Sequence, residues 1–530
     1  MHAIQIAYNR LGNWSHTDLA YLQHDPALTP FYTFPVHPSS FSSLLESRKK
    51  FSVDRHLWLA TVKAQYRKLG FAMPVDDQVF LSEKTFTVTT AHQPVLFTGP
   101  LYHIYKIAST IHLARSIEHT FPDHRILPVF VLGSEDHDWA ELNHFHLFGK
   151  KVEWERSVSG PGGRISLDGL NTLIETVDQK LGNTAHGKEV VEILYTSLQR
   201  ASNYGEFHQA LLLALFQEHG LIVINLDDPE CKRAFVPLME KEIREHFSYQ
   251  YVTPTQKELE HAGFKPQAFC RLLNLFYLSV DRRERLDVAD GNIIRVDSGI
   301  TASLENTIED LHQHPERFSP NVVMRPLYQE LILPNLAYIG GGGEIAYWLE
   351  RKSQFEAAGV HFPMLVRRNS LMMIDSNTAN QIEKADLTWE DLLHEYDVIV
   401  KSFLTRHSQT NLNFEEESAL LSKAYAQLAA KAEKLDPTLA TAILAEQHKQ
   451  IKQFEQLGSR LLRTEKQLQE THLKRIQKIK ERLFPEGGLQ ERYENFLPYY
   501  AVYGARWIDA MVEICDPLEE KFTVVQLQEV

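Results

Sequence analysis

Residues 86–144 read FTVTTAHQPVLFTGPLYHIYKIASTIHLARSIEHTFPDHRILPVFVLGSEDHDWAELNH. Two apolar, β-branched runs, at 86–90 and 126–132, enclose a stretch after Pro100 whose apolar residues recur at spacings near three and four. Strand, amphipathic helix and strand in this order predict one βαβ unit with parallel strands. Polar residues follow both strands, and open α/β sheets bind ligands at the carboxyl ends of their strands. We therefore expect two polar clusters at one edge of a parallel sheet.

The first polar cluster, TAHQPVLFTGP, lies between the first strand and the helix. Thr98 supplies a capping hydroxyl, Gly99 a flexible residue and Pro100 a residue suited to a first helical turn. The free backbone N–H groups of this helix start would then lie beside His92 and Gln93. One interpretation is a cradle for phosphate or carboxylate oxygens. The other is a simple strand-to-helix turn.

The second cluster, GSEDHDWAELNH, crowds carboxylates and imidazoles after the second strand. Its candidate binding residues are Glu135, Asp136, His137, Asp138, Asn143 and His144. Neighbouring acids repel one another unless something compensates them, which favours a site for an amine, a sugar or a metal over a capped helix with ordinary surface acids. His137 and His144 lack the i, i+4 spacing of a helical zinc pair, so no metal site is predicted.

The helix between the clusters has one apolar stripe, which predicts one buried face. Lys106 and Arg115 lie on this helix. Charged side chains of this kind are mostly exposed in proteins, so we expect both at the surface.

Three later segments extend the sheet. LIVINL at 221–226 reads as a buried parallel strand, and HFPMLVRRNSLMMID at 361–375 as one further strand. Between them, an apolar run at 337–339 leads into four glycines, which let a backbone approach a ligand closely. This third candidate site is neither a GxGxxG nor a GxxxxGK[ST] motif. It comprises Gly341, Gly342, Gly343 and Glu344.

The pattern predicts an α/β protein with an enlarged, doubly wound, Rossmann-like core. Three separated strands at 274–280, 285–288 and 292–296 indicate an antiparallel meander. We expect a helical lead-in at 1–84, core segments at 85–149, 221–229 and 320–380, connecting insertions at 150–220 and 230–319, a helical arm at 384–484, and a C-terminal segment at 485–530 that folds back on the core.

The helical arm contains one glycine, Gly458, and apolar residues at helical spacing. Asp436 and Pro437 suit the cap and first turn of its second helix. An antiparallel helical hairpin, and a coiled coil, are therefore predicted. A long polar surface with one apolar seam needs a partner, so we expect a homodimer through this arm.

Composition limits the class of protein. The net charge of -14 argues against broad nucleic-acid binding, which needs clustered Lys and Arg. The three cysteines are far apart and form no CxxC pair, which excludes a disulfide framework and a cysteine zinc site. No apolar run approaches the roughly 20 residues of a membrane span. We expect a soluble cytoplasmic protein with no membrane contact.

Several ordered blocks resemble one known family along essentially the whole chain. These are TAHQPVLFTGPLYHIYKI, PVFVLGSEDHDWAELNH, NLFYL, RPLYQELILPNLAYIGGGGEIAYWLE and VRRNSLMMI, followed by the helical arm and YGARW. Together they resemble BshC, the cysteine ligase family of bacillithiol biosynthesis. The resemblance implies a Rossmann-like core of the class I aminoacyl-tRNA-synthetase type, two insertions and a dimerising C-terminal coiled coil.

The reaction implied by the resemblance joins cysteine to malyl-glucosamine. The cysteine carboxylate then needs activation, for which ATP is expected. His92, Gln93, Thr98 and Gly99 would hold phosphate or carboxylate oxygens, and the second cluster would hold the amine or sugar.

The resemblance also extends the expected site beyond the two clusters. We add Asn274 and Tyr277 of the NLFYL block to the expected substrate contacts, and the glycine run to the nucleotide contacts. No KMSKS-type lysine is present, so Arg367 or Arg368 is expected to meet transition-state charge. The sequence assigns no catalytic residue and leaves a metal requirement open.

Two other functions fit the same sequence. One is a different synthetase-like ligase or nucleotidyltransferase that acts on another small acid. The other is a scaffold or accessory protein built on the helical arm, for which the polar clusters would be dispensable.

Overall fold

The computed structural model describes residues 2–12, 14–158, 160–279, 282–408 and 414–528. Position 280 of the expected meander and positions 409–413 of the expected arm lie outside the described residues. The chain forms two compact units. The first comprises Met1–Asn9, Asn13–Met373 and Gly488–Val530, and the second Arg10–Gly12 and Ile374–Gly487.

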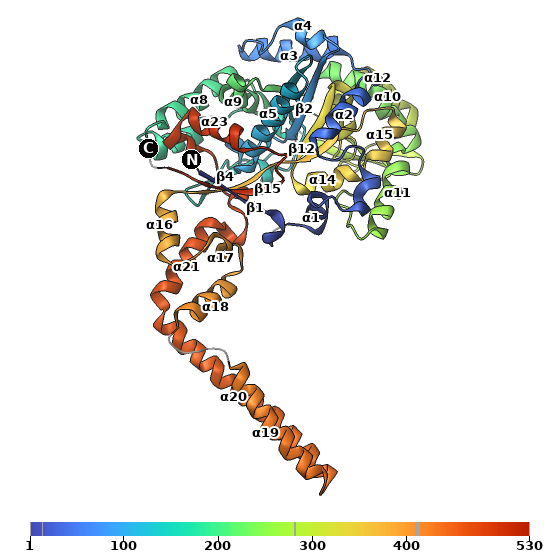
Figure 1. Ribbon diagram of the computed structural model, residues 1–530. Helices are drawn as coiled ribbons and strands as arrows, with labels where there is room; N and C mark the ends of the chain where they lie inside the picture. The colour runs from blue at the N-terminus through green and yellow to red at the C-terminus, as the bar shows by residue number, and fades with distance from the viewer. Residues whose placement is uncertain (1, 13, 159, 280–281, 409–413, 529–530) are drawn as a thin grey trace. The chain divides into compact units, whose positions relative to one another are not determined.

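A five-stranded parallel sheet forms the centre of the first unit (Figure 1). Its order is β13-β12-β2-β3-β6, and each neighbouring pair is parallel. The chain first builds outward from β2 in one direction and later in the other, so the topological switch point lies between β2 and β12. The predicted Rossmann-like core is confirmed. The strands are β2 (Thr85–His92), β3 (Arg125–Leu132), β6 (Ile222–Asn225), β12 (Asn335–Gly340) and β13 (Met364–Arg367).

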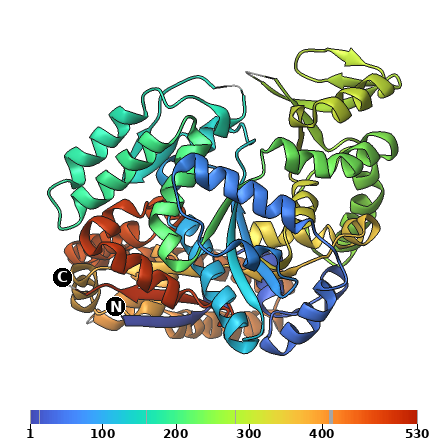
Figure 2. The same cartoon turned by 90° about the horizontal axis from the view of Figure 1, so that it is seen from above.

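Helix α5 (Tyr102–Thr120) packs along β2 and β3 and is buried on more than one face. The reason is α23 (Ala505–Ile514), which the C-terminal segment lays against α5 (Figure 2). The C-terminal segment therefore folds back on the core. The single buried stripe expected from the sequence underestimated the burial of α5, because a helix pattern does not reveal a cover that arrives 400 residues later.

The lead-in to the sheet contains α1 (His16–Leu22), α2 (Phe41–Arg48), α3 (Arg55–Leu69) and α4 (Asp77–Leu81). Asp54 caps α3 by accepting the Leu57 N–H at 2.9 Å. Gly70 ends α3 with a φ of 70°, in the left-handed region that glycine adopts without strain. Local capping signals thus mark both ends of this helix.

The two insertions differ in secondary structure. The first contains α7 (Leu170–Leu181), α8 (Gly187–Arg200) and α9 (Tyr204–Phe216). The second contains α10 (Pro229–Glu245), α11 (Phe247–His261), α12 (Leu304–Gln313) and a small sheet. Its strands β7 (Leu275–Leu278), β8 (Arg283–Ala289) and β9 (Asn292–Arg295) pair antiparallel, which confirms the predicted meander.

The segment at 361–375 forms two strands rather than the one expected. β13 completes the parallel sheet, whereas β14 (Ser370–Ile374) joins β1 (His2–Ala7) and β15 (Lys521–Gln526) in a second sheet. The chain changes sheets at Arg368 and Asn369, whose side chains are buried in polar contacts. The lead-in is accordingly not only helical, because β1 pairs with β15.

The second unit is helical. After α16 (Ser376–Lys384), α17 (Trp389–Leu393) and α18 (Tyr396–His407), helices α19 (Glu415–Glu433) and α20 (Pro437–Leu468) run side by side, and α21 (Glu470–Leu483) follows (Figure 1). Asp436 caps α20 by accepting the Thr438 N–H at 2.7 Å. The predicted helical hairpin is confirmed. Throughout the residues described, no helix has both the length and the apolar character to cross a membrane.

Candidate functional site

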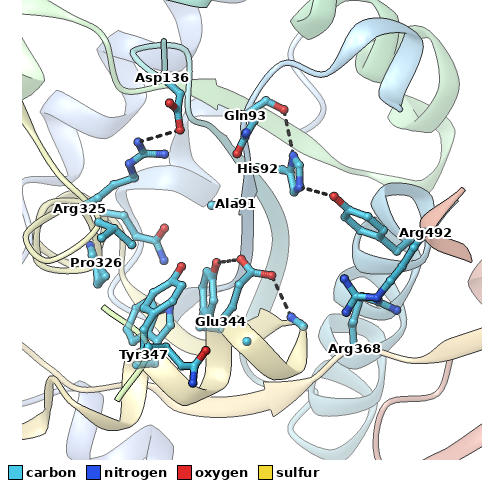
Figure 3. A pocket seen from close by; sticks show the side chains of 18 residues that line it. Ala91, His92, Gln93, Asp136, Arg325, Pro326, Glu344, Tyr347, Arg368 and Arg492 are labelled. Atoms are coloured by element: carbon cyan, nitrogen blue, oxygen red, sulfur yellow. Dashed lines mark hydrogen bonds and ion pairs between the residues drawn. The ribbon is translucent and has the colours of Figure 1, made fainter. Parts of the chain in front are cut away.

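The carboxyl ends of the central strands enclose a cavity of about 480 Å³, which we call the carboxyl-edge pocket (Figure 3). It lies at the switch point between β2 and β12, where open α/β sheets bind ligands. Its walls also include α5, α13 (Arg325–Ile332), the start of α14 (Gly342–Leu349) and the C-terminal segment. Its polar side chains include His92, Gln93, Tyr102, Asp136, Gln267, Arg325, Gln329, Tyr338, Glu344, Tyr347, Arg368 and Arg492.

The structure brings parts of all three candidate sites into this pocket. The polar clusters after β2 and β3 meet at one sheet edge, and the glycine run closes the third side. The roles given to these residues stay predictions. The expected site residues that line the pocket are His92, Gln93, Asp136, Gly341, Gly343, Glu344 and Arg368.

Glu344 is fixed at the start of α14 by four hydrogen bonds. Lys106 Nζ donates to Oε1 at 2.9 Å and to Oε2 at 2.8 Å. Tyr338 Oη donates to Oε1 at 2.8 Å, and the Gly341 N–H donates to Oε2 at 2.9 Å. Burial raises the pKa of Glu344, but Lys106 and the Gly341 N–H outweigh burial, and the net pKa lies below its ordinary value. Glu344 is thus an ionised, immobile part of the pocket wall.

Lys106 is not the surface charge expected from the sequence. It is 0% exposed, because its side chain runs to the end of β2 and the start of α14 rather than to solvent. Its Nζ also donates to the Ala91 carbonyl oxygen at 2.5 Å, which ties the end of β2 to Glu344. Burial lowers the pKa of Lys106, and the nearby Glu344 carboxylate offsets this only in part. Arg115, farther along α5, has a side chain that is 49% exposed, as expected.

His92 is held as a neutral imidazole. Its Nδ1 lies 3.1 Å from the Gln93 carbonyl oxygen, which can only accept, so Nδ1 carries the hydrogen. Nε2 is then the acceptor for the Tyr102 hydroxyl at 3.1 Å. Burial and the Lys106 ammonium lower the pKa of His92 to about 4. A group with this pKa is a weak base at neutral pH.

Asp136 lies opposite Glu344 and has room for a ligand. Its Oδ1 accepts the His137 N–H at 2.8 Å and the Asp138 N–H at 3.3 Å. The guanidinium groups of Arg325 and Arg283 form longer ion pairs with the Asp136 carboxylate, at 3.9 and 4.0 Å. Burial raises the pKa of Asp136, but the two arginines and the backbone donors outweigh it, and the net pKa is lowered. Oδ2 is ion-paired with Arg325 at 3.9 Å but accepts no hydrogen bond within the described chain, so this ionised oxygen can still accept one from a ligand.

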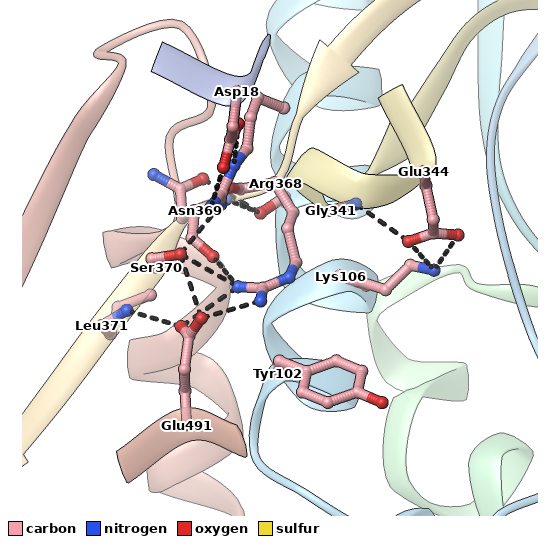
Figure 4. A network of polar contacts seen from close by, with 12 residues as sticks. Asp18, Tyr102, Lys106, Gly341, Glu344, Arg368, Asn369, Ser370, Leu371 and Glu491 are labelled. Atoms are coloured by element: carbon pink, nitrogen blue, oxygen red, sulfur yellow. Dashed lines mark hydrogen bonds and ion pairs between the residues drawn. The ribbon is translucent and has the colours of Figure 1, made fainter. Parts of the chain in front are cut away.

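Three arginines line the pocket and differ in their hydrogen-bond partners. Arg368 is bound to Glu491, with Nη2 at 2.7 Å from Oε1 and Nη1 at 3.0 Å from Oε2 (Figure 4). Burial raises the pKa of Glu491, and Arg368 more than reverses this. Arg325 and Arg492 have no hydrogen-bond partner among the residues that the structure describes. They are the cations available to a ligand.

Arg367 and Gly342 were both expected to bind the nucleotide. Both instead lie against Asp18 of α1. The Arg367 guanidinium pairs with Asp18 at 3.2 and 3.3 Å and lies against the rings of Tyr8 and Trp14. A Cβ on Gly342 would lie 2.1 Å from the Asp18 carboxylate, so this glycine makes room for α1. Neither residue lines the carboxyl-edge pocket, and their role in nucleotide binding stays a prediction that this placement does not favour.

Thr98 and Gly99 form no open cradle. Their φ angles of 66° and 59° break the expected cap, and α5 begins only at Tyr102. The Leu101 N–H donates to the Glu494 carbonyl oxygen at 2.7 Å, and the Asn495 amide donates to the Gly99 carbonyl oxygen at 2.6 Å. The C-terminal segment therefore occupies the helix start that the sequence left free.

The rest of the second cluster disperses around the pocket. Glu135 is buried and pairs with Lys232 at 2.5 Å. Asp138 caps the short helix Trp139–Leu142, and His144 begins the strand β4 (His144–Leu147). The side chain of Asn143 donates away from the cavity, to Glu153 at 2.9 Å. Asp136 is the member of this cluster that lines the pocket.

Asn274 and Tyr277 also lie outside the pocket. Asn274 is buried and donates to Glu242 at 2.8 Å. The Tyr277 hydroxyl donates to Asp310 at 2.8 Å, in a separate cavity of the second insertion. Neither lines the carboxyl-edge pocket, and their contact with a substrate stays a prediction.

Several pocket residues were not predicted from the sequence, Arg325, Tyr347, Tyr102 and Arg492 among them. Arg325 and Tyr347 lie within the RPLYQELILPNLAYIGGGGEIAYWLE block, which was a usable signal. Tyr102 lies in the block after the first strand, two residues beyond Pro100. Arg492 lies in ERYENF and carried no signal, because its approach depends on the return of the C-terminal segment. For the residues described, no group of three His, Cys, Asp or Glu could hold a metal ion.

Two family models of known proteins match nearly the whole chain. Residues 1–369 match the family model described as "Bacillithiol biosynthesis BshC, N-terminal Rossmann-like domain", and residues 371–527 match "Bacillithiol biosynthesis BshC, C-terminal coiled-coil domain". These matches agree with the parallel sheet and the helical hairpin. The predicted fold class is confirmed.

Relatives named "Putative cysteine ligase BshC" match over most of their length. The protein of Flavobacterium johnsoniae is 34% identical over 526 residues, covering 98% of this chain and 99% of its own. That of Bacillus cereus is 29% identical over 459 residues, covering 84% and 85%.

Among solved structures, Mycobacterium tuberculosis methionyl-tRNA synthetase bound to methionyl-adenylate is similar with a TM-score of 0.22 and 11% identity, covering 81% of this chain and 92% of that one. A likeness this weak carries no argument about fold or function. The two family models, by contrast, span nearly every residue and confirm the resemblance seen in the sequence. The chain belongs to the BshC family of bacillithiol biosynthesis.

Proposed function

We propose that this protein is a cytoplasmic cysteine ligase that joins the carboxylate of cysteine to the amine of malyl-glucosamine, with ATP activating the carboxylate. The observation that carries the proposal is the carboxyl-edge pocket. It combines an ionised carboxylate, Asp136, whose Oδ2 has only a long ion pair to Arg325 at 3.9 Å, with two guanidinium groups, Arg325 and Arg492, that form no hydrogen bond in the described chain. Membership of the BshC family supplies the substrate class.

Asp136 is suited to hold the amine. An ammonium group donates to carboxylate oxygens, and Oδ2 of Asp136 accepts no hydrogen bond in the described part of the chain. The ammonium group loses one proton to solvent to become a nucleophile, attacks the activated carboxyl carbon, and loses a second proton as the amide forms. The new bond is C–N, and the bond that breaks joins this carbon to the activating oxygen. Asp136 therefore orients the nucleophile before attack.

Arg325 and Arg492 suit the anionic partners. Guanidinium groups bind carboxylate and phosphate oxygens with paired N–H donors. A Cβ on Gly343 would meet no atom within 4 Å, so the backbone at the start of α14 is open to the cavity. The residues present therefore fit a nucleotide phosphate. ATP, when bound, would convert a carboxylate oxygen into a leaving group, and this chain's residues would hold the reactants together.

The pocket also restricts proton transfer. His92 is neutral and its Nε2 is engaged by Tyr102, so we do not assign it the role of general base. Lys106 and Glu344 neutralise each other and keep the α14 start in place. Catalysis in this proposal relies on positioning and charge stabilisation.

The test is to incubate the purified full chain with ATP, cysteine and malyl-glucosamine and to detect bacillithiol by mass spectrometry. We expect product formation that requires all three substrates. Omission of ATP separates ligation from uncatalysed condensation. Failure to form product with the complete mixture, in protein shown to be folded, would contradict the proposal.

We further propose that the α19–α20 hairpin pairs with a second copy of the chain. Large apolar side chains remain exposed along it: Leu420, Leu428, Leu435, Leu439, Leu444, Leu457, Leu461 and Leu468. An apolar seam of this kind in a coiled coil is buried by association. Sedimentation equilibrium should give twice the chain mass, and a monomer at micromolar concentration would refute this assembly.

A further inference from the structure

A second large cavity lies at the opposite end of the central sheet. Its volume is about 820 Å³, and we call it the amino-edge cavity. Phe86 at the start of β2 lines it, whereas His92 at the end of β2 lines the carboxyl-edge pocket. Six residues of extended strand separate the two, a distance of roughly 20 Å. The amino-edge cavity is therefore a separate site, outside the place where this fold ordinarily binds ligands.

The lining of the amino-edge cavity is basic. Five Lys and Arg side chains line it against three carboxylates, in a chain whose net charge is -14. One of these carboxylates, Asp54, already accepts a backbone hydrogen bond as the cap of α3. Burial and the Lys49 and Lys84 ammonium groups lower the pKa of His124, which also lines the cavity. The local potential is thus opposite in sign to that of the whole protein.

Arg48 forms the buried part of this lining. It is 2% exposed, and its Nη1 and Nη2 donate to the carbonyl oxygens of Phe51 and Leu333 at 2.6 and 3.1 Å. Its Nε is buried and finds no hydrogen-bond partner in the described part of the molecule. Across the described residues, no carboxylate lies within ion-pair distance of Arg48. The nearby Glu330 carboxyl offsets the cost of burying this cation only in part, because burial still lowers the pKa of Arg48 to about 10. A bound anion would offset more of that cost.

Other donors surround Arg48 and have no carboxylate of their own. Arg55 donates to the Phe80 and Thr85 carbonyl oxygens at 3.3 and 2.9 Å, which leaves its positive charge uncompensated by an ion pair in the described structure. Lys50 and Lys84 are exposed at the rim. His124 Nδ1 is buried and, like Arg48 Nε, unpaired among the described residues. Donors and positive charges thus converge from several loops.

We propose that the amino-edge cavity binds a small phosphate-bearing molecule. A phosphate group accepts hydrogen bonds on several oxygens, which matches converging guanidinium, ammonium and imidazole donors. The cavity has the volume of a small-molecule site, and its apolar lining, including Phe51, Phe86 and Pro334, can take an organic group. This proposal is independent of the ligase reaction.

The test uses the full chain and isothermal titration calorimetry at low ionic strength with two probes, inorganic phosphate and phenyl phosphate. We expect one site per chain. Tighter binding of phenyl phosphate would identify an organic phosphate as the ligand type, and equal affinity would identify free phosphate. Absence of heat with both probes at millimolar concentration would overturn the proposal.

Variants assign the binding to the cavity. Lys50→Ala with Lys84→Ala removes two exposed charges without touching the core, and should weaken binding at least about tenfold, because each lysine loses a charge-assisted hydrogen bond. Lys180→Ala with Lys188→Ala removes two exposed lysines from α7 and α8 and is the matched control. Arg325→Ala tests the carboxyl-edge pocket. Binding that survives the Lys50 and Lys84 changes, or that is lost with Arg325→Ala, would refute the assignment.

Discussion

Lys106 on α5 donates to both carboxylate oxygens of Glu344 on α14, at 2.9 and 2.8 Å. This contact joins the βαβ unit at 86–144 to the glycine-rich segment after β12. The same Nζ binds the Ala91 carbonyl oxygen. One buried cation thus fixes two walls of the carboxyl-edge pocket. Its removal should affect folding as well as binding.

Lys106→Met should destabilise the protein by about 3–5 kcal/mol, since it leaves the Glu344 carboxylate buried without its counter-charge. Guanidinium chloride unfolding measures the loss. Arg115→Met, on the same helix but exposed, is the control and should change the free energy of unfolding by less than about 0.5 kcal/mol. The double variant Lys106→Met with Glu344→Gln should recover part of the loss. An additive loss instead would show that the two side chains do not interact.

Asp136→Asn should reduce kcat/KM for malyl-glucosamine about tenfold to a hundredfold, because the amide loses the negative charge that holds an ammonium group. The fold should be retained, since the asparagine oxygen can still accept the His137 N–H. Steady-state kinetics with the amine substrate varied measure the effect. Asp138→Asn, at the helix cap, is the matched control. Equal effects of the two changes would exclude a special role for Asp136.

His92 should not titrate in the working range. Its pKa of about 4 keeps the imidazole neutral from pH 5.5 to 8.5, so no inflection near pH 6.5 should come from this residue. The variant His92→Gln should lower the rate while leaving the shape of the pH–rate profile unchanged. The measurement is kcat against pH for both proteins. Loss of an inflection in the variant would identify His92 as an acid or base after all.

Gly133 keeps Arg325 in place. A Cβ at position 133 would lie 2.5 Å from Arg325 Nη1, so Gly133→Ala should displace the guanidinium group and raise KM for the anionic substrate. The clash involves the end of a flexible side chain, so stability should fall by less than about 1 kcal/mol. Gly12→Ala, where a Cβ meets nothing within 4 Å, is the control. An unchanged KM would remove Arg325 from the binding site.

Glu330 should make stability depend on pH. It is 2% exposed, and burial raises its pKa to about 7 although Gln329 and Asn335 donate to it. The folded protein then binds more protons than the unfolded chain between about pH 4.5 and 7, so stability falls as the pH rises through this window, by about 3 kcal/mol in total. Glu330→Gln should therefore be more stable than the parent at pH 8. Unfolding curves at pH 5 and 8 test this, and a parallel pH dependence of both proteins would contradict it.

Local patterns predicted those features that depend on neighbouring residues. The βαβ unit, the meander and the hairpin around Asp436 all follow from periodicity and capping, and the structure has them. The meeting of His92 with Asp136 followed from the rule that parallel strands present their carboxyl ends together. These features required no knowledge of distant segments.

Long-range packing explains the failures. Lys106 is buried because its ammonium contacts Ala91 and the distant Glu344, and Thr98 lies under the chain near Asn495. Arg367 turns toward Asp18, and the neighbouring Arg368 turns toward Glu491. Adjacent arginines in one motif thus face different partners, which no local pattern distinguishes.

The return of residues 491–495 to the pocket has a consequence for synthesis of the protein. Glu491 holds Arg368, Arg492 lines the cavity, and Asn495 closes the loop before α5. A ribosome must therefore translate past Asn495 before the pocket that begins at His92 can be completed. Nascent or truncated chains that lack residues 491–495 can form parts of the sheet, but they cannot complete the walls of this pocket.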